Sequence, residues 1–174
     1  MSIVSSYHSN PLKIDLKNPR KLDPFIISEK AIQKIRFNVM HDKHVEEILY
    51  IKEYRVWDNA IEAIFDRDYY TEMAASPDHL IFLSALVNLQ KMVYIYMHYY
   101  LYIDYSLSDE EKIKIWPTDL NLSMPKMIFD KKNVKHRMDI KSIKYVGDGK
   151  YYVIANTHVN DIVKISGKAL AIIL

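Results

Sequence analysis

The chain contains no cysteine, which excludes disulfide bonds, thiolate nucleophiles and zinc–thiolate sites. Glycine is also scarce, and with only three among 174 residues a glycine-rich phosphate loop cannot form. Basic and acidic side chains nearly balance, at a formal net charge of +2, so the concentrated basic face of a nucleic-acid-binding protein is not expected. We therefore expect no nucleic acid partner, and the chemistry argued below needs no metal or bound organic cofactor.

The first residues show no basic segment followed by an apolar run, which predicts no secretory signal and a cytoplasmic protein. Because 49% of the residues are hydrophobic, the chain can build an ordered core, and its length fits one domain. Asn-Pro and Asp-Pro pairs make residues 1–24 irregular. We predict an N-terminal arm over residues 1–24 and a single domain over residues 25–174.

The most distinctive stretch is residues 76–103, which are apolar on nearly every side of a predicted helix. Ser76 is a good N-cap, and Pro77 suits the first helical position. A helix of this kind is buried in a protein core or in a membrane. A membrane span is disfavoured by four polar residues near its middle, Asn88, Gln90, Lys91 and His98. We therefore predict a buried helix.

A β-hairpin is predicted before this helix. Residues 46–57 and 60–65 are rich in β-formers and are separated by Asp58-Asn59, a tight-turn pair. Residues 66–70 are expected to end the hairpin. A short helix is predicted over residues 29–40. In the connector that follows, His41 and His44 are interpreted as a solvated loop rather than as metal ligands.

Strands are also predicted after the helix. Prolines confine any strand within residues 120–129 to a short or edge position. Residues 135–146, 150–159 and 162–174 alternate as strands, with turns at 147–149 and 160–161. The fold class is then α+β, with an antiparallel sheet against one long helix. One sheet cannot cover the whole helix, so the remaining apolar surface predicts a homodimer or a higher homo-oligomer.

The predicted helix start carries the best candidate chemistry. Residues 76–79 would occupy the N-cap to N3 positions, where free N–H groups and the helix dipole stabilise negative charge. A thioester carbonyl bound there would be polarised as in an oxyanion hole. His79 could act as a general acid or base, or it could simply pack or cap. Tyr69 and Tyr70, just before the helix, could donate to a carbonyl oxygen or could be ordinary strand-end residues.

Helical spacing defines two stripes beyond this start. Gln90 lies eleven residues after His79, about 16 Å along the axis, which suits an acyl tail or a site completed by another subunit. It shares a stripe with Leu83, Leu86 and Tyr94. A second, polar stripe suggests satisfied core amides at a subunit contact and consists of Ser84, Asn88 and Lys91. The basic residues within 131–137 form a solvated edge or steer phosphopantetheine or an acidic carrier.

From about residue 32 to 173 the chain resembles the FcoT-like family of type III fatty acyl-CoA thioesterases, which have the hotdog fold. Residues 78–80 and 88–94 are similar to the family's Gly-His-Phe and Phe-Asn-Gln-Leu-Ala-Tyr runs. His79 and Tyr94 match, Gln90 stands where the family has a functional Asn, and Tyr70 matches a family active-site Tyr. Two positions depart from the family, with Ile81 replacing a second Asn and His41 replacing another Tyr.

The resemblance implies a hotdog enzyme acting on fatty acyl thioesters of CoA or of an acyl-carrier protein. Hydrolysis is one implied reaction. The other is Michael addition of glycine to a 2-enoyl-acyl-carrier protein, which needs a cation such as Arg137, Lys126 or Arg67 for the glycine carboxylate. The expected catalytic residues are Tyr70, His79 and Gln90. The expected substrate-binding residues are Tyr69, Asp78, Leu83, Ser84, Leu86, Val87, Asn88, Tyr94 and Arg137.

Two alternatives remain open at the level of sequence. The same pocket could belong to a non-catalytic module that binds an acyl chain or lipid. The fold could instead be a cystatin-like or nuclear-transport-factor-like α+β fold, in which the helix would precede the strands rather than lie between the second and third.

Overall fold

The computed structural model describes residues 25–27, 45–71, 78–103 and 112–174. The predicted short helix at 29–40, the connector with His41 and His44, and the predicted helix start at Ser76 and Pro77 lie outside the described residues. The division into an arm over 1–24 and one domain over 25–174 stays a prediction. Within the described residues no helix combines the length and the apolar character that a bilayer crossing requires.

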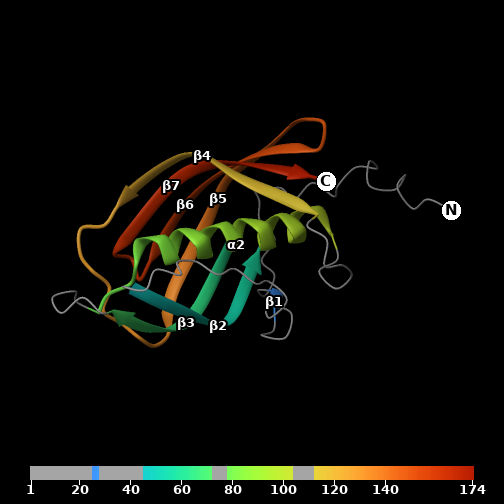
Figure 1. The fold of residues 1–174 in the computed structure, drawn as a ribbon. Coiled ribbons are helices and arrows are strands. Elements are labelled where there is room, and N and C mark those ends of the chain that lie inside the picture. Colours follow the sequence, from blue (N-terminus) through green and yellow to red (C-terminus); the bar gives the residue numbers. More distant parts are fainter. Residues whose placement is uncertain (1–24, 28–44, 72–77, 104–111) are drawn as a thin grey trace.

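A seven-stranded antiparallel sheet and one long helix make up the described structure (Figure 1). Along the sheet the strands follow the order β1-β2-β3-β5-β6-β7-β4. The helix, α2, spans Phe82–Leu101. The strands are β1 (Phe25–Ile27), β2 (Val45–Trp57), β3 (Ala60–Thr71), β4 (Ile113–Ser123), β5 (Val134–Gly147), β6 (Lys150–Val159) and β7 (Val163–Ile173).

The helix lies between β3 and β4 in the chain and carries it from one side of the sheet to the opposite edge. In Figure 1 the sheet curves around α2, which crosses its concave face. This is the α+β arrangement that the hotdog resemblance implies. A fold in which the helix precedes the strands is excluded, because β2 and β3 come before α2.

Alternation along the strands decides which face of the sheet meets the helix. In β6, Tyr151, Val153 and Val159 are buried, whereas Tyr152 and Ile154 between them are exposed. Successive strand residues point to opposite faces, so each strand sends one set to the core and the other to the outer face. The core set packs against the buried side of α2, which includes Ala85, Met92, Ile95 and Tyr96.

Several predicted boundaries are wrong. β4 spans Ile113–Ser123 instead of lying within residues 120–129, although it is an edge strand as predicted. The hairpin does not end at residue 66, because β3 continues to Thr71 and pairs with β2 as far as Val45. The helix begins at Phe82 rather than at residue 76 or 77, so Asp78 and His79 precede the helix and do not occupy its first turn. The end of β3 and the start of α2 both lie beside long-range contacts of Glu47 and Arg67, which are described with the site below. At the other end α2 stops at Leu101, before residue 103.

A buried polar cluster joins the helix to the sheet. The Tyr54 hydroxyl donates to Asn88 Oδ1 at 3.0 Å, and Asn88 Nδ2 lies 3.1 Å from His136 Nδ1. Such a cluster fixes how the helix sits on the sheet, because any shift would leave buried polar atoms without partners. Burial lowers the pKa of His136 to about 3, so this imidazole stays neutral in the folded protein.

His136 makes the stability of the fold sensitive to acid. The unfolded state takes up a proton near pH 6.5 and the folded state only near pH 3, so stability falls as the pH drops through this window. The slope from one such group is at most about 1.4 kcal/mol per pH unit. Urea unfolding at pH 7 and pH 5 should show the wild type losing about 2 kcal/mol more than His136→Gln, whose side chain does not titrate.

Comparing the stability losses of the two proteins removes the effect of other titrating groups. His98 is one of them, because burial lowers its pKa to about 4. These groups are present in both proteins and cancel in the difference. Equal losses of stability in the wild type and in His136→Gln would show that His136 is accessible to protons in the folded state.

Candidate functional site

A fully buried arginine organises the region where α2 begins. Arg67 lies on β3, and its side chain and that of Glu47 on β2 are 0% exposed, with Nη1 3.1 Å from Glu47 Oε1. Arg67 Nη2 also lies 2.9 Å from Asp78 Oδ1, and Nε donates to the carbonyl of Asp130 at 2.9 Å. One guanidinium therefore connects two strands, the segment before the helix and the loop between β4 and β5.

Glu47 provides the cap that the sequence around the helix start lacks. Its Oε2 accepts a hydrogen bond from the Ile81 N–H at 2.9 Å, at the N-cap position of α2, where no side chain caps locally. Burial raises the pKa of Glu47, although hydrogen bonds from Ser84 and Ile81 and the charge of Arg67 act in the opposite direction. A carboxylate at this end of the helix is also favoured by the helix dipole.

The backbone of the segment before the helix is held on both sides. The Leu80 N–H donates to the Ile128 carbonyl at 2.8 Å, and the Ile81 N–H is taken by Glu47. These two amides are therefore not available to polarise a substrate carbonyl. The N–H groups that remain for such a role belong to the first turn of α2, which starts at Phe82.

His79 lies in this segment and is half-buried. Its ring centroid is 6.0 Å from that of Tyr69, with the rings tilted by 42°. The neighbouring Asp78 is paired with both Arg67 and Lys131. Burial acts to raise the pKa of Asp78, but the hydrogen bond from Lys131 and the charge of Arg67 outweigh it and hold the pKa below its ordinary value. A histidine, a tyrosine and a fixed carboxylate thus meet at one end of the helix.

An incompletely covered stripe of α2 runs away from His79. Leu83 is exposed, and Leu86, Val87, Gln90 and Tyr94 are only partly buried. Leu86 and Tyr94 also pack against the core, so Leu83 is the exposed member of this stripe, and the expectation that a second copy covers the helix stays a prediction. Ser84 and Asn88, on the neighbouring stripe, are buried, so they act as internal polar contacts to Glu47 and to Tyr54 and His136.

The structure does not bring all of the predicted site residues together. Tyr70 follows Tyr69 on β3, points to the other face of the strand and is 60% exposed. Gln90 lies eight residues into α2, about 12 Å along the axis from Phe82, and its amide donates to the Ile115 carbonyl on β4 at 3.3 Å. Arg137 lies on the outer face of the sheet, where it pairs with Asp139 and covers the Trp57 ring.

The sequence did not predict that Glu47 and Arg67 organise this region. Glu47 is half of an acidic pair at the start of a strand, and Arg67 sits between two aspartates, so both resemble ordinary surface positions. Side-chain alternation along β3 was the signal that could have identified Arg67 as buried, because Arg67 and Tyr69 share the face of β3 that carries the buried Phe65. Among the described residues, no three His, Asp or Glu side chains gather as a metal site would need.

Comparisons with known proteins give weak similarity only. No family model matches the chain, and no curated protein matches it. Solved structures are similar to it, among them three thioesterases. A mutant thioesterase from Pseudomonas aeruginosa has a TM-score of 0.41 and 12% identity over 71% of this chain and 82% of that one.

The second is a thioesterase family protein from Silicibacter pomeroyi, with a TM-score of 0.39 and 12% identity over 67% of this chain and 79% of that one. The third is a thioesterase from Haemophilus influenzae, with a TM-score of 0.40 and 13% identity over 67% and 73%. Similarity at this level does not carry a substrate or a catalytic residue over to this chain.

Proposed function

We propose that the protein hydrolyses fatty acyl thioesters, of CoA or of an acyl-carrier protein, at the N-terminal end of α2. The observation that carries the proposal is the half-buried His79, in ring contact with Tyr69, directly before a helix whose apolar stripe is partly exposed. A polar reacting end followed by an apolar track matches the two parts of such a substrate. The resemblance of residues 78–94 to the FcoT-like family supports the same assignment.

In this proposal water attacks the thioester carbonyl carbon, and His79 takes its proton as general base. The negative charge that develops on the carbonyl oxygen is stabilised by the N–H groups of the first helical turn and by a tyrosine hydroxyl. Tyr69 is the tyrosine beside His79, and Tyr70 would take part only if the exposed side of β3 is covered. When the intermediate collapses, the thiolate leaves and accepts the proton from His79.

The acyl chain would follow the stripe of Leu83, Leu86, Val87 and Tyr94. Among the described residues this stripe is only partly covered, with Leu83 exposed, and we propose that a second copy of the chain covers the rest. β4 lies at an edge of the described sheet and is eleven residues long, which offers a pairing edge for that copy. Gln90 would then line the track or complete the partner's site, since it lies too far along the helix to act beside His79.

Glycine addition is the less favoured reaction for this site. It requires a cation to hold the glycine carboxylate near the reacting carbon. Arg67 is already engaged by Glu47 and Asp78, and Arg137 is on the outer face of the sheet. Lys126, on the exposed loop after β4, is the cation of the three that has no ion pair among the described residues.

Incubation with saturated and 2-enoyl thioesters of CoA and of a carrier protein, with and without glycine, tests the proposal by mass spectrometry. We expect free fatty acid from both kinds of thioester, independent of glycine. A glycine adduct that stays on its carrier would show that the protein catalyses glycine addition and not hydrolysis. Bound but unchanged thioester would instead indicate a non-catalytic acyl-binding module and would overturn the proposal.

A further inference from the structure

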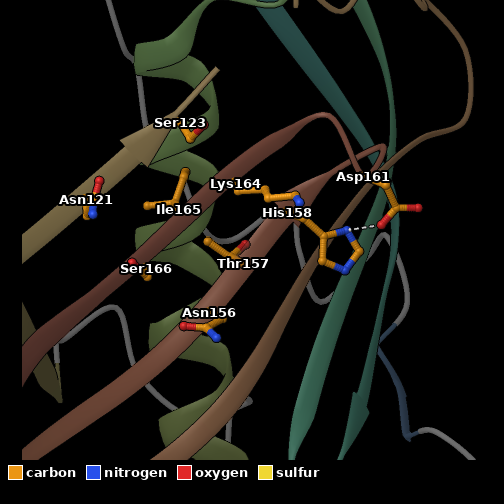
Figure 2. Close-up of a pocket in the computed structure, with 9 residues that line it drawn as sticks. All are labelled: Asn121, Ser123, Asn156, Thr157, His158, Asp161, Lys164, Ile165 and Ser166. Carbon is orange, nitrogen blue, oxygen red and sulfur yellow. Dashed lines mark ion pairs between the residues drawn. The ribbon is translucent and has the colours of Figure 1, made fainter. Parts of the chain in front are cut away.

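A second site lies on the other face of the sheet, away from α2 and His79. It is a shallow trough of about 460 Å³, lined by side chains of β4, β6, β7 and the turn between β6 and β7 (Figure 2). Its exposed residues alternate with the core residues of the same strands, so they point away from the helix. The volume lies in the range of small-molecule sites.

Strand register arranges the polar side chains of the trough in two rows. In the first row Asn121 on β4, Ser166 on β7 and Asn156 on β6 are direct neighbours. In the second, Ser123, Lys164 and His158 are direct neighbours on the same three strands. Neighbouring strands are about 4.8 Å apart, and the rows about 7 Å. Three uncharged hydrogen-bonding groups thus lie beside a basic row.

The basic row continues into β5, where Arg137 is paired in register with His158. Arg137 and His158 are balanced by Asp139 at 3.0 Å and by Asp161 at 2.9 Å. In the part of the chain that the structure describes, no carboxylate pairs with Lys164. Like charges directly opposite each other on neighbouring strands are destabilising, and of the three basic side chains Lys164 is the one whose charge no carboxylate offsets among the described residues. Nδ1 of His158 lies toward Asp161, so the protonated form of this imidazole has the N–H at Nε2 that an anionic ligand needs.

We propose that this trough binds a phosphate monoester that also carries hydroxyl groups, of the sugar phosphate or nucleotide type. The phosphate would accept hydrogen bonds from Nζ of Lys164 and from the Nε2–H of the protonated His158, since donors on neighbouring strands can share its oxygens. The hydroxyl groups would hydrogen-bond to Asn121, Ser166 and Asn156, which both donate and accept. The polar lining is unsuited to an acyl chain, so this site is separate from the proposed active site and does not depend on it.

Calorimetric titration of the full chain with adenosine 5′-monophosphate and with adenosine tests the site. We expect saturable binding of the monophosphate and none of the nucleoside. Lys164→Gln should weaken binding about tenfold or more, because a charge-assisted hydrogen bond is lost. Lys168→Gln is the matched control, on the same face of the same strand and paired with Asp119. It should bind like the wild type.

Coenzyme A as a competitor identifies the source of the phosphate. Displacement of the monophosphate by coenzyme A supports the site and assigns its phosphate to the thioester carrier, and absence of displacement with intact binding supports a separate metabolite. The site is overturned if the monophosphate does not bind or if Lys168→Gln weakens binding as much as Lys164→Gln. It is also overturned if amide chemical shifts on addition change at residues 78–84 instead of 121, 156 and 166. Thioester hydrolysis by Lys164→Gln is measured alongside, so that failure of either proposal is seen independently.

Discussion

Replacing Arg67 by Met should destabilise the protein by about 3–5 kcal/mol, because it leaves Glu47 buried without its partner charge. Arg67 also holds Asp78 and the carbonyl of Asp130, so the segment before α2 and the loop after β4 should loosen together. The free energy of unfolding in urea at pH 7 measures the loss. Amide hydrogen exchange at residues 78–81 should be faster in the variant than in the wild type, whereas exchange in the core of β6 should change less.

Arg55→Met is the matched control, since Arg55 lies on the neighbouring strand β2 and pairs with Glu53 and Glu62 at a partly exposed position. Exposed pairs are worth about 1 kcal/mol or less, so this variant should be close to the wild type. If Arg67→Met loses no more stability than Arg55→Met, the buried cluster does not organise the site. A double variant with Glu47→Gln should recover part of the loss, because the orphaned charge is removed.

The second large effect concerns catalysis. His79→Ala should lower kcat for acyl thioester hydrolysis about 100-fold or more, since a general base contributes about 10²–10⁴-fold. KM should change little, because the acyl chain binds along the helix and not at the imidazole. Steady-state rates against long-chain acyl-CoA measure both constants. Tyr69→Phe should lower kcat as well, if its hydroxyl stabilises the oxyanion.

Leu83→Ala should have the opposite effects on kcat and KM. It shortens the apolar track and should raise KM more than it lowers kcat. Lys141→Ala, at an exposed position on β5, should leave both constants unchanged. A His79→Ala variant that is folded and retains the wild-type kcat would remove His79 from the reaction.

Local signals explain which parts of the fold could be predicted from sequence. The turns around 147–149 and 160–161 contain Gly, Asp and Asn, and the structure has positive φ angles at Asp148, Gly149, Asn160 and Asp161. Each boundary of the three strands that flank them lies within one residue of the predicted range. The buried helix was also predictable, because its apolar character is continuous.

The helix start and the end of β3 depended on distant contacts. The capping carboxylate of Glu47 is 34 residues away from Ile81, and no local pattern announces it. The charged run at 66–70 predicts the end of the hairpin, although Arg67 has its buried partner on β2. Since the end of β3 was misplaced, the choice between Tyr69 and Tyr70 could not be made from alternation. The position next to His79 belongs to Tyr69.

The most direct test of the proposed active site locates the acyl chain itself. A long-chain acyl-CoA analogue with a non-hydrolysable thioether and a diazirine in its acyl chain is irradiated with the protein, and the labelled peptides are identified by mass spectrometry. Labels on residues 82–101, competed by the natural acyl-CoA, are the result that the proposal predicts. Labels confined to the outer face of the sheet, or none that the natural substrate competes for, would contradict it.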